Sequence, residues 1–135
     1  MSGKSGEVLL DLMLAAAAAV GKVETLDRTR FAVGTQEIVV SASAQADDTC
    51  TREGSLAFLP LKPPPNGSLT YRAGRRFMQF KAGSATQKAC AGKRVETIDV
   101  YYAAREGFQG IEEFQYAIVF PDRTVRHYKA KVTVW

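Results

Sequence analysis

The sequence is poor in the residue types on which most catalytic and metal sites depend. It contains one histidine, two cysteines and one tryptophan in 135 residues. The cysteines, Cys50 and Cys90, do not form the closely spaced pairs typical of zinc or redox centres. The histidine, His127, has no nucleophile beside it in the sequence, whereas a catalytic triad needs a nucleophile, a base and a group that orients the base. Zinc, redox and triad chemistry are therefore left without a sequence signal.

Long hydrophobic runs and phosphate-binding motifs are also missing. The apolar stretches stay short of the roughly 20 residues that a membrane-spanning helix needs. Neither the Gly-x-x-x-x-Gly-Lys loop nor the Gly-x-Gly-x-x-Gly turn of nucleotide-binding proteins occurs. We therefore expect no transmembrane segment, no cofactor, no metal and no enzyme activity. A hydrolase that uses two carboxylates, or His127 with a serine, ranks a distant third among the functions considered.

What is present indicates one small β-rich domain. The composition, 46% hydrophobic and 24% charged, is typical of a globular protein. From residue 35 onward, short segments rich in β-branched and aromatic residues alternate with Gly, Pro and Asn. This pattern predicts an all-β, immunoglobulin-like sandwich of about seven strands. The predicted strands are residues 37–42, 55–61, 68–72, 76–80, 97–103, 113–120 and 124–135.

Several details of this arrangement are specific enough to test. Residues 113–120 place four large apolar side chains on one face, so we expect this strand to be central. The last strand carries Lys129 and Lys131 on its outward face, and we expect it to lie at a sheet edge. Residues 73–75 are expected to form a tight turn between two short strands, and residues 81–94 a polar loop. Asn66-Gly67 is interpreted as a turn rather than as a glycosylation site.

The first 21 residues have two interpretations. Lys4 and the apolar stretch that ends at Val20 resemble a secretory signal, although Glu7 and Asp11 are unfavourable for export. Alternatively, the apolar residues recur at the spacing of one helical face, and Gly21 would end such a helix. The expected organisation is a signal-like or helical segment at residues 1–21 and a sandwich domain at residues 22–135.

The two cysteines are best explained as one structural disulfide. Cys50 and Cys90 are 40 positions apart, and on the chain-entropy model a bridge of that span stabilises a fold by about 3 to 4 kcal/mol. Such a bridge needs an oxidising compartment, so we expect a periplasmic or secreted protein. Two free thiols in a cytoplasmic protein are the alternative.

Basic residues are concentrated in one part of the chain. Between residues 61 and 100 there are eight Lys and Arg residues but only two Asp and Glu residues. This excess could attract an anionic polysaccharide or a cell-envelope protein; a specific nucleic acid is not indicated. The alternative is a solvated polar face. Tyr71, Phe77 and Tyr101 would add stacking contacts if exposed. The candidate anion-binding residues are Arg72, Arg75, Arg76, Lys93 and Arg94.

Four short motifs resemble the bacterial Ig-like and cadherin-like repeats of secreted and surface proteins. Residues 65–70 are Pro-Asn-Gly-Ser-Leu-Thr, and residues 100–110 are Val-Tyr-Tyr-Ala-Ala-Arg-Glu-Gly-Phe-Gln-Gly. Residues 114–116 are Phe-Gln-Tyr, and residues 132–134 are Val-Thr-Val. The resemblance covers about 70 residues, those between the first and last motif. It implies a binding or structural module without a catalytic centre.

The resemblance also implies roles for individual residues. Gly107 and Gly110 would permit a strand-to-strand crossing, and Phe108 would close the end of the core. Phe114 and Tyr116 would face inward. The sequence lacks an acidic linker motif for calcium, and the pairs Glu112-Glu113 and Asp47-Asp48 are interpreted as solvated turns.

Two functional hypotheses follow. The first is an exported, non-catalytic binding or structural module that contacts an anionic polymer or protein through its basic segment. The alternative is a small assembly subunit that oligomerises through an edge strand or an N-terminal helix. The sequence leaves the oligomeric state open.

Overall fold

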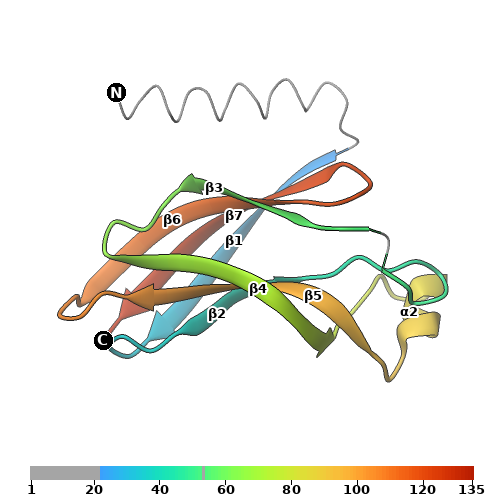
Figure 1. Ribbon diagram of the computed structural model, residues 1–135, viewed down its shortest axis with the longest axis horizontal. Helices are drawn as coiled ribbons and strands as arrows, with labels where there is room; N and C mark the ends of the chain where they lie inside the picture. Colours follow the sequence, from blue (N-terminus) through green and yellow to red (C-terminus); the bar gives the residue numbers. More distant parts are fainter. Residues whose placement is uncertain (1–21, 53) are drawn as a thin grey trace.

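Residues 22–52 and 54–135 are described by a computed structural model, in which they form two β-sheets packed face to face (Figure 1). Sheet A has the order β1-β7-β6-β3, and sheet B has the order β2-β5-β4. The predicted all-β immunoglobulin-like sandwich of seven strands is confirmed. Residues 1–21, for which a signal or a helix was expected, lie outside the described residues. The elements are β1 (Lys22–Ala32), β2 (Ile38–Ser43), β3 (Ala57–Lys62), β4 (Gly67–Phe77), α2 (Ala85–Cys90), β5 (Arg94–Ala104), β6 (Gly110–Val119) and β7 (Thr124–Val134).

The described chain has its helix at one end of the sandwich. Figure 1 shows α2 at that end and the turns after β1 and β5 at the opposite end. No helix within residues 22–52 and 54–135 is long and apolar enough to cross a membrane.

The last strand is central in its sheet, so the prediction of an edge position is wrong. β7 pairs in parallel with β1, from Lys22–Thr124 to Ala32–Val134, and in antiparallel with β6. Its outward lysines therefore face solvent from the middle of sheet A, so they do not block the pairing of a further strand at a sheet edge. The error arose because β1 itself was not predicted. The expected central position of the 113–120 strand is confirmed, since β6 lies between β7 and β3.

β1 escaped prediction because neither of its faces is apolar. Glu24, Arg28 and Arg30 alternate with residues such as Asp27 and Thr29, so polar side chains occupy both sides of the strand. Such a strand is stable at an edge because β7 supplies its hydrogen-bonding partner along the whole length.

Two further predictions fail between the third and the fifth strand. The expected turn at residues 73–75 is absent, because β4 runs without interruption from Gly67 to Phe77 and pairs with β5 throughout. The expected polar loop at residues 81–94 contains α2, a six-residue helix. Ser84 caps this helix by accepting a hydrogen bond from the Gln87 amide, and the Gln87 side chain accepts one from the Gly83 amide.

The core is built on a row of stacked aromatic rings. Tyr102 stacks on Phe114, Phe114 on Tyr116, and Tyr116 on Tyr128, with ring centroids 5.3, 6.4 and 5.0 Å apart. All four side chains are buried, so the predicted inward orientation of Phe114 and Tyr116 is confirmed. Each buried hydroxyl has a partner, because an unpaired one would be destabilising. Tyr116 bonds to Ser41, Tyr128 to Ser43, and Tyr102 to Glu112.

Candidate anion-binding site

β4 and β5 extend beyond the part of the sandwich that sheet A covers. Tyr71 on β4 pairs with the fully buried Val100, so it belongs to the face that looks toward the core. Alternation along a strand places Ala73, Arg75 and Phe77 on this same face. All four are exposed, Tyr71 by 54% and Phe77 by 64%. We call this surface, with Arg94 and Glu96 beside it on β5, the β4–β5 shelf.

The inner end of the shelf is closed by an aromatic contact between the sheets. Tyr71 stacks on Phe58 of β3 with the ring centroids 4.7 Å apart. Beyond this contact a small hollow of about 140 Å³ lies against Ile98, Glu96 and Arg52. Arg52 forms an ion pair with Glu96 at 3.1 Å. The single acidic residue of the shelf is therefore already neutralised by a cation from outside it.

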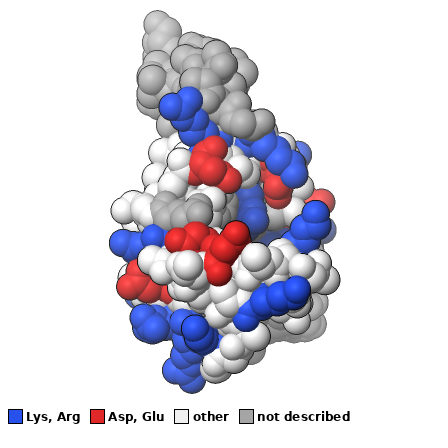
Figure 2. Space-filling model, turned by 90° about the vertical axis from the view of Figure 1, so that its right-hand side faces the viewer, with Lys and Arg blue, Asp and Glu red and all other residues white. Residues whose placement is uncertain are grey.

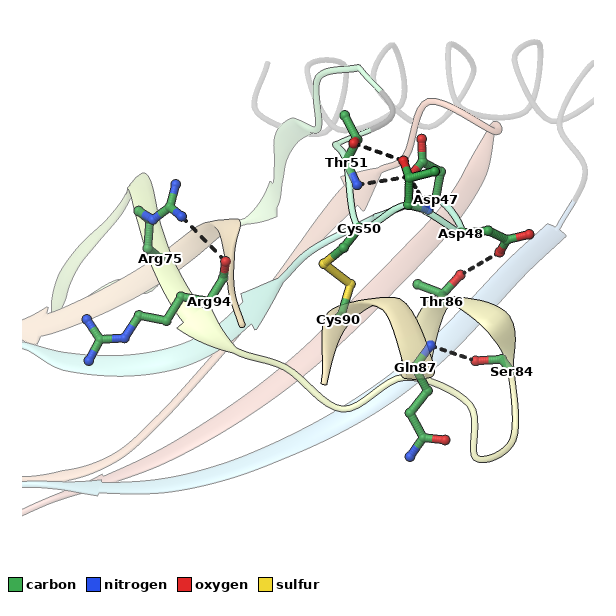
Figure 3. The surroundings of a disulfide bond; sticks show 11 residues. Asp47, Asp48, Cys50, Thr51, Arg75, Ser84, Thr86, Gln87, Cys90 and Arg94 are labelled. Carbon is green, nitrogen blue, oxygen red and sulfur yellow. Dashed lines mark hydrogen bonds between the residues drawn. A yellow bond between two sulfur atoms is a disulfide. The ribbon is translucent and has the colours of Figure 1, made fainter. Parts of the chain in front are cut away.

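The five predicted cations lie at neighbouring positions of β4 and β5 but on two different faces. Arg72 and Arg76 stand on the outward face of sheet B, with Gly74 between them. Arg75 and Arg94 lie on the shelf, where an Arg75 guanidinium nitrogen donates to the Arg94 carbonyl oxygen over 3.4 Å (Figure 3). Lys93 lies in the turn before β5.

The two cations on the outward face are paired with carboxylates. Arg72 forms an ion pair with Glu37 and lies over the ring of Tyr101, with its guanidinium carbon 3.7 Å from the ring centroid. Arg76 lies 3.1 Å from Asp99. The pKa of each guanidinium is raised, chiefly by its carboxylate partner. These two arginines are therefore poorly placed to provide free positive charge.

The other three predicted cations have no such partner in the described part of the chain. Within residues 22–52 and 54–135, no carboxylate lies at ion-pair distance from Arg75, Lys93 or Arg94. Arg94 lies over the ring of Phe77 instead, with 5.3 Å between the guanidinium carbon and the centroid. Unpaired cations can bind an anion, and the exposed ring beside them can stack on an apolar or planar group. Sequence reasoning identified the five cations but not the carboxylates Glu37 and Asp99. These carboxylates neutralise two of the five and leave the other three without an acidic partner among the described residues.

The surface charge around α2 is mixed. Figure 2 looks at this end of the molecule and shows Lys and Arg around the margin with acidic side chains between them. On this side of the molecule, the excess of basic residues along the sequence therefore does not form one continuous basic face. Free positive charge is local, and the shelf is one place where it gathers.

The disulfide fastens the loop after β2 to the helix before β5. Cys50 and Cys90 are bonded, as predicted (Figure 3). A second contact joins the same two segments, because Thr86 of α2 donates a hydrogen bond to Asp48. Asp47 accepts hydrogen bonds from Thr49 and from the Thr51 amide, which lowers its pKa. The pair Asp47-Asp48 thus forms a turn, as predicted, and its role is to hold Cys50 against α2.

The prediction for Glu112 is wrong, because this residue is only 1% exposed. It faces the core from β6, and its carboxylate accepts hydrogen bonds from the backbone amide of Asn66 and the hydroxyl of Tyr102, at 2.7 and 3.2 Å. Asn66 lies in the turn between β3 and β4, so the expected turn is confirmed at Asn66, whereas Gly67 already begins β4. Glu112 fixes this turn onto the end of the core, which the acidic pair alone did not indicate.

The other features of the described residues that could carry chemistry are His127 and two open hollows. His127 contacts Gln115 at 2.8 Å, and burial together with Lys129 lowers its pKa. Within residues 22–52 and 54–135, no three His, Cys, Asp or Glu side chains gather as metal ligands. Two open hollows of about 400 and 420 Å³ contain charges of both signs, such as Glu24 with Arg126 and Glu113 with Lys131.

The fold and this surface define a class: a small, disulfide-linked β-sandwich with a cationic and aromatic shelf at one strand edge. No family model matches the chain, and no similar curated protein or solved structure was found.

Proposed function

We propose that the protein is an exported, non-catalytic binding module that contacts an anionic polymer or protein through Arg75, Lys93 and Arg94. The observation that supports this most strongly is the absence of carboxylate partners for these cations in the described residues, beside the exposed ring of Phe77. Unpaired cations attract anionic groups at long range, and the exposed ring adds a surface for apolar or stacking contact at short range.

Export is proposed on the strength of the disulfide. Cys50 and Cys90 form a bond that lasts in oxidising compartments and is reduced in most cytoplasms. The resemblance to bacterial Ig-like repeats of surface and secreted proteins points the same way. Intact mass of the protein from separated cell fractions, with and without reduction before alkylation, tests this. We expect the protein to be found outside the cytoplasm and to gain two alkyl groups only after reduction. Free thiols on a cytoplasmic protein would contradict export.

The binding proposal is tested with heparin as a sulfated polysaccharide probe. We expect salt-sensitive binding, and removal of two contacts in Arg75→Gln/Arg94→Gln should reduce the slope of log affinity against log salt by roughly one to two. The matched control is Lys129→Gln/Lys131→Gln, which removes the same charge from the outward face of sheet A. Equal weakening by both double variants would mean that net charge, and not the shelf, governs binding.

An assembly subunit is the second candidate, and a separate surface favours it. Phe31 and Ile111 flank Thr133 on the outward face of sheet A. Val33 and Trp135 continue that face, and all four apolar side chains are 58 to 65% exposed. An exposed cluster of this kind is typical of an interface. The occupant proposed here is a second copy of the chain, in contact through this cluster beside the β1 edge.

Sedimentation measures the assembly directly. We expect a mass that rises with concentration and is insensitive to salt, and that stays monomeric in Phe31→Ser/Trp135→Ser. The control Phe77→Ser removes an equally exposed ring from the other end of the molecule. A monomeric mass of the unmodified protein at high concentration would remove this candidate.

A further inference from the structure

β4 presents a long and unprotected strand edge. It is the edge strand of sheet B, and its 11 residues pair with β5 on one side only. Every second residue of such a strand points its N–H and C=O groups away from the partner. In the described chain, no backbone hydrogen bond outside the sheet ladder involves residues 67–77. These groups are therefore available to a further strand.

The other three edges each carry a feature that opposes strand addition. β3 contains Pro60 and a register shift, and β2 contains a register shift between Val39 and Ser41. β1 directs Arg28 and Arg30 toward the inside of the sandwich. Proline, bulges and inward charges are known means of blocking an edge. β4 has neither a proline nor a register shift, and its one charge on the core-facing side, Arg75, is exposed beyond the part of the sandwich that sheet A covers.

The side chains of β4 determine which strand could pair with it. Arg75 lies on the shelf between Ala73 and Phe77, and Tyr71 is at the inner end. A second copy of β4 would bring like charges together, whereas an acidic strand would bring opposite charges together. Directly opposed side chains in neighbouring strands lie about 4.5 to 5.5 Å apart, so they interact strongly. Charge complementarity therefore selects an acidic partner.

We propose that β4 binds an extended acidic peptide segment, which adds to sheet B as a fourth strand. The inference rests on the proposed function and names its ligand. The peptide places a carboxylate opposite Arg75 and apolar side chains opposite Tyr71 and Phe77, on alternate positions of one face. Backbone hydrogen bonds to β4 supply affinity, and these three positions supply specificity. Arg72 and Arg76 contribute little, because Glu37 and Asp99 already pair with them.

The probe is a blocked heptapeptide, Val-Thr-Glu-Thr-Glu-Thr-Val. Its pattern is the same in both directions, so it can add parallel or antiparallel to β4. In NMR spectra of the full-length protein we expect shifts confined to β4 and its neighbours. We also expect slower hydrogen exchange at alternate amides of residues 67–77. Shifts that centre on sheet A would overturn the proposal.

Two altered peptides separate strand pairing from simple charge attraction. Replacement of both glutamates by lysine should weaken binding by at least about tenfold, which corresponds to one lost charge pair and a new repulsion. N-methylation of alternate backbone nitrogens keeps every charge but removes the pairing groups, and should weaken binding similarly. Equal binding of the methylated and unmethylated peptides would overturn strand addition without any variant of the protein.

A charge swap locates the site. Arg75→Glu should lose the glutamate peptide and gain the lysine peptide, whereas the control Lys129→Glu on β7 should bind both as the unmodified protein does. Failure of this exchange overturns the proposal, provided that NMR shifts outside β4 show a retained fold. If heparin binds at the shelf but the methylated peptide binds as well as the unmethylated one, strand addition is wrong and the proposed function remains. If neither heparin nor peptide binds, both are wrong.

Discussion

The guanidinium group of Arg76 lies 3.1 Å from the carboxylate of Asp99, which is almost completely buried although it stands on the outward face of sheet B. Three features enclose this carboxylate. Thr97 donates a hydrogen bond to it at 2.7 Å, Arg76 covers it, and Gly74 on the neighbouring strand leaves room for it. The ion pair therefore has less solvent around it than an ordinary surface pair, and its integrity depends on the missing side chain at Gly74.

Gly74→Ala should destabilise the protein. A methyl group at this position would collide with the Asp99 carboxylate and crowd the Thr97 hydroxyl. Overpacking of this kind lowers the free energy of unfolding by about 1 to 3 kcal/mol. Urea unfolding measures the loss. Ser68→Ala, on the same face of β4 and exposed, should change stability by less than about 0.5 kcal/mol; an equal loss in both variants would contradict this account of Gly74.

Glu112→Ala should have a much larger effect than the same change at its neighbour. Removal of the Glu112 carboxylate leaves the Asn66 amide and the Tyr102 hydroxyl without their acceptor. Buried groups left unpaired lower stability by about 1 to 3 kcal/mol each. Glu113 is exposed, so Glu113→Ala is the matched control and should be nearly neutral. Thermal unfolding of the two variants decides the point, and similar melting temperatures would mean that Glu112 does not hold the turn.

Removal of the disulfide in Cys50→Ser/Cys90→Ser should lower the free energy of unfolding by about 3 to 4 kcal/mol. The residual contact between Asp48 and Thr86 is exposed and cannot replace the bridge. Hydrogen exchange should accelerate first in α2, while the core strands β6 and β7 keep their protection. Reduction of the unmodified protein should reproduce this pattern, and uniform acceleration in all strands would show that the bridge supports the whole sandwich instead.

Stability should fall in alkaline solution through two tyrosines. Burial raises the pKa of Tyr102 and of Tyr116 above the ordinary value of about 10. The unfolded chain then releases these protons at a lower pH than the folded chain does. The stabilisation is complete below pH 9 and is lost as the pH rises above about 10, by up to about 1.4 kcal/mol per pH unit for each tyrosine.

Urea unfolding between pH 8 and pH 11 measures this loss. Lysines also titrate in that range, so the comparison is with Tyr102→Phe/Tyr116→Phe, whose stability should depend less steeply on pH. The control is Tyr71→Phe, which also removes a tyrosine hydroxyl, but from an exposed residue. Identical slopes in all three proteins would show that the buried hydroxyls ionise as they do in the unfolded chain.

The fold class was predictable because strands with one apolar face can be recognised from the alternation of residues in their own sequence. β6 and β7 each carry alternating large apolar side chains, and the two glycines at 107 and 110 bound the turn before β6 with positive φ angles. β1 was not predictable in this way, since its polar faces are stabilised by a partner about 100 residues later. The correct total of seven strands resulted from two compensating errors, one strand missed and one divided.

The candidate site was predictable only as a set of charges. Local composition located Arg72, Arg75 and Arg76, but Glu37 and Asp99 lie 35 and 23 residues away from their partners. Residues this far apart in the sequence cannot be recognised as ion pairs from the sequence alone. The fold was therefore needed to tell which cations are neutralised and which are unpaired. Gly74 was interpreted as a turn residue for the same reason, because the carboxylate that needs its space belongs to β5.

The parallel pairing of β1 with β7 has a mechanical consequence. Lys22 lies beside Thr124, and Ala32 lies beside Val134, so the two strands overlap over eleven residue pairs and run in the same direction (Figure 1). A pulling force applied between Lys22 and Trp135 would slide these strands along each other and load all their hydrogen bonds at the same time. Bonds loaded together resist far more force than bonds opened one after another, which makes this domain suited to bear tension between its two ends.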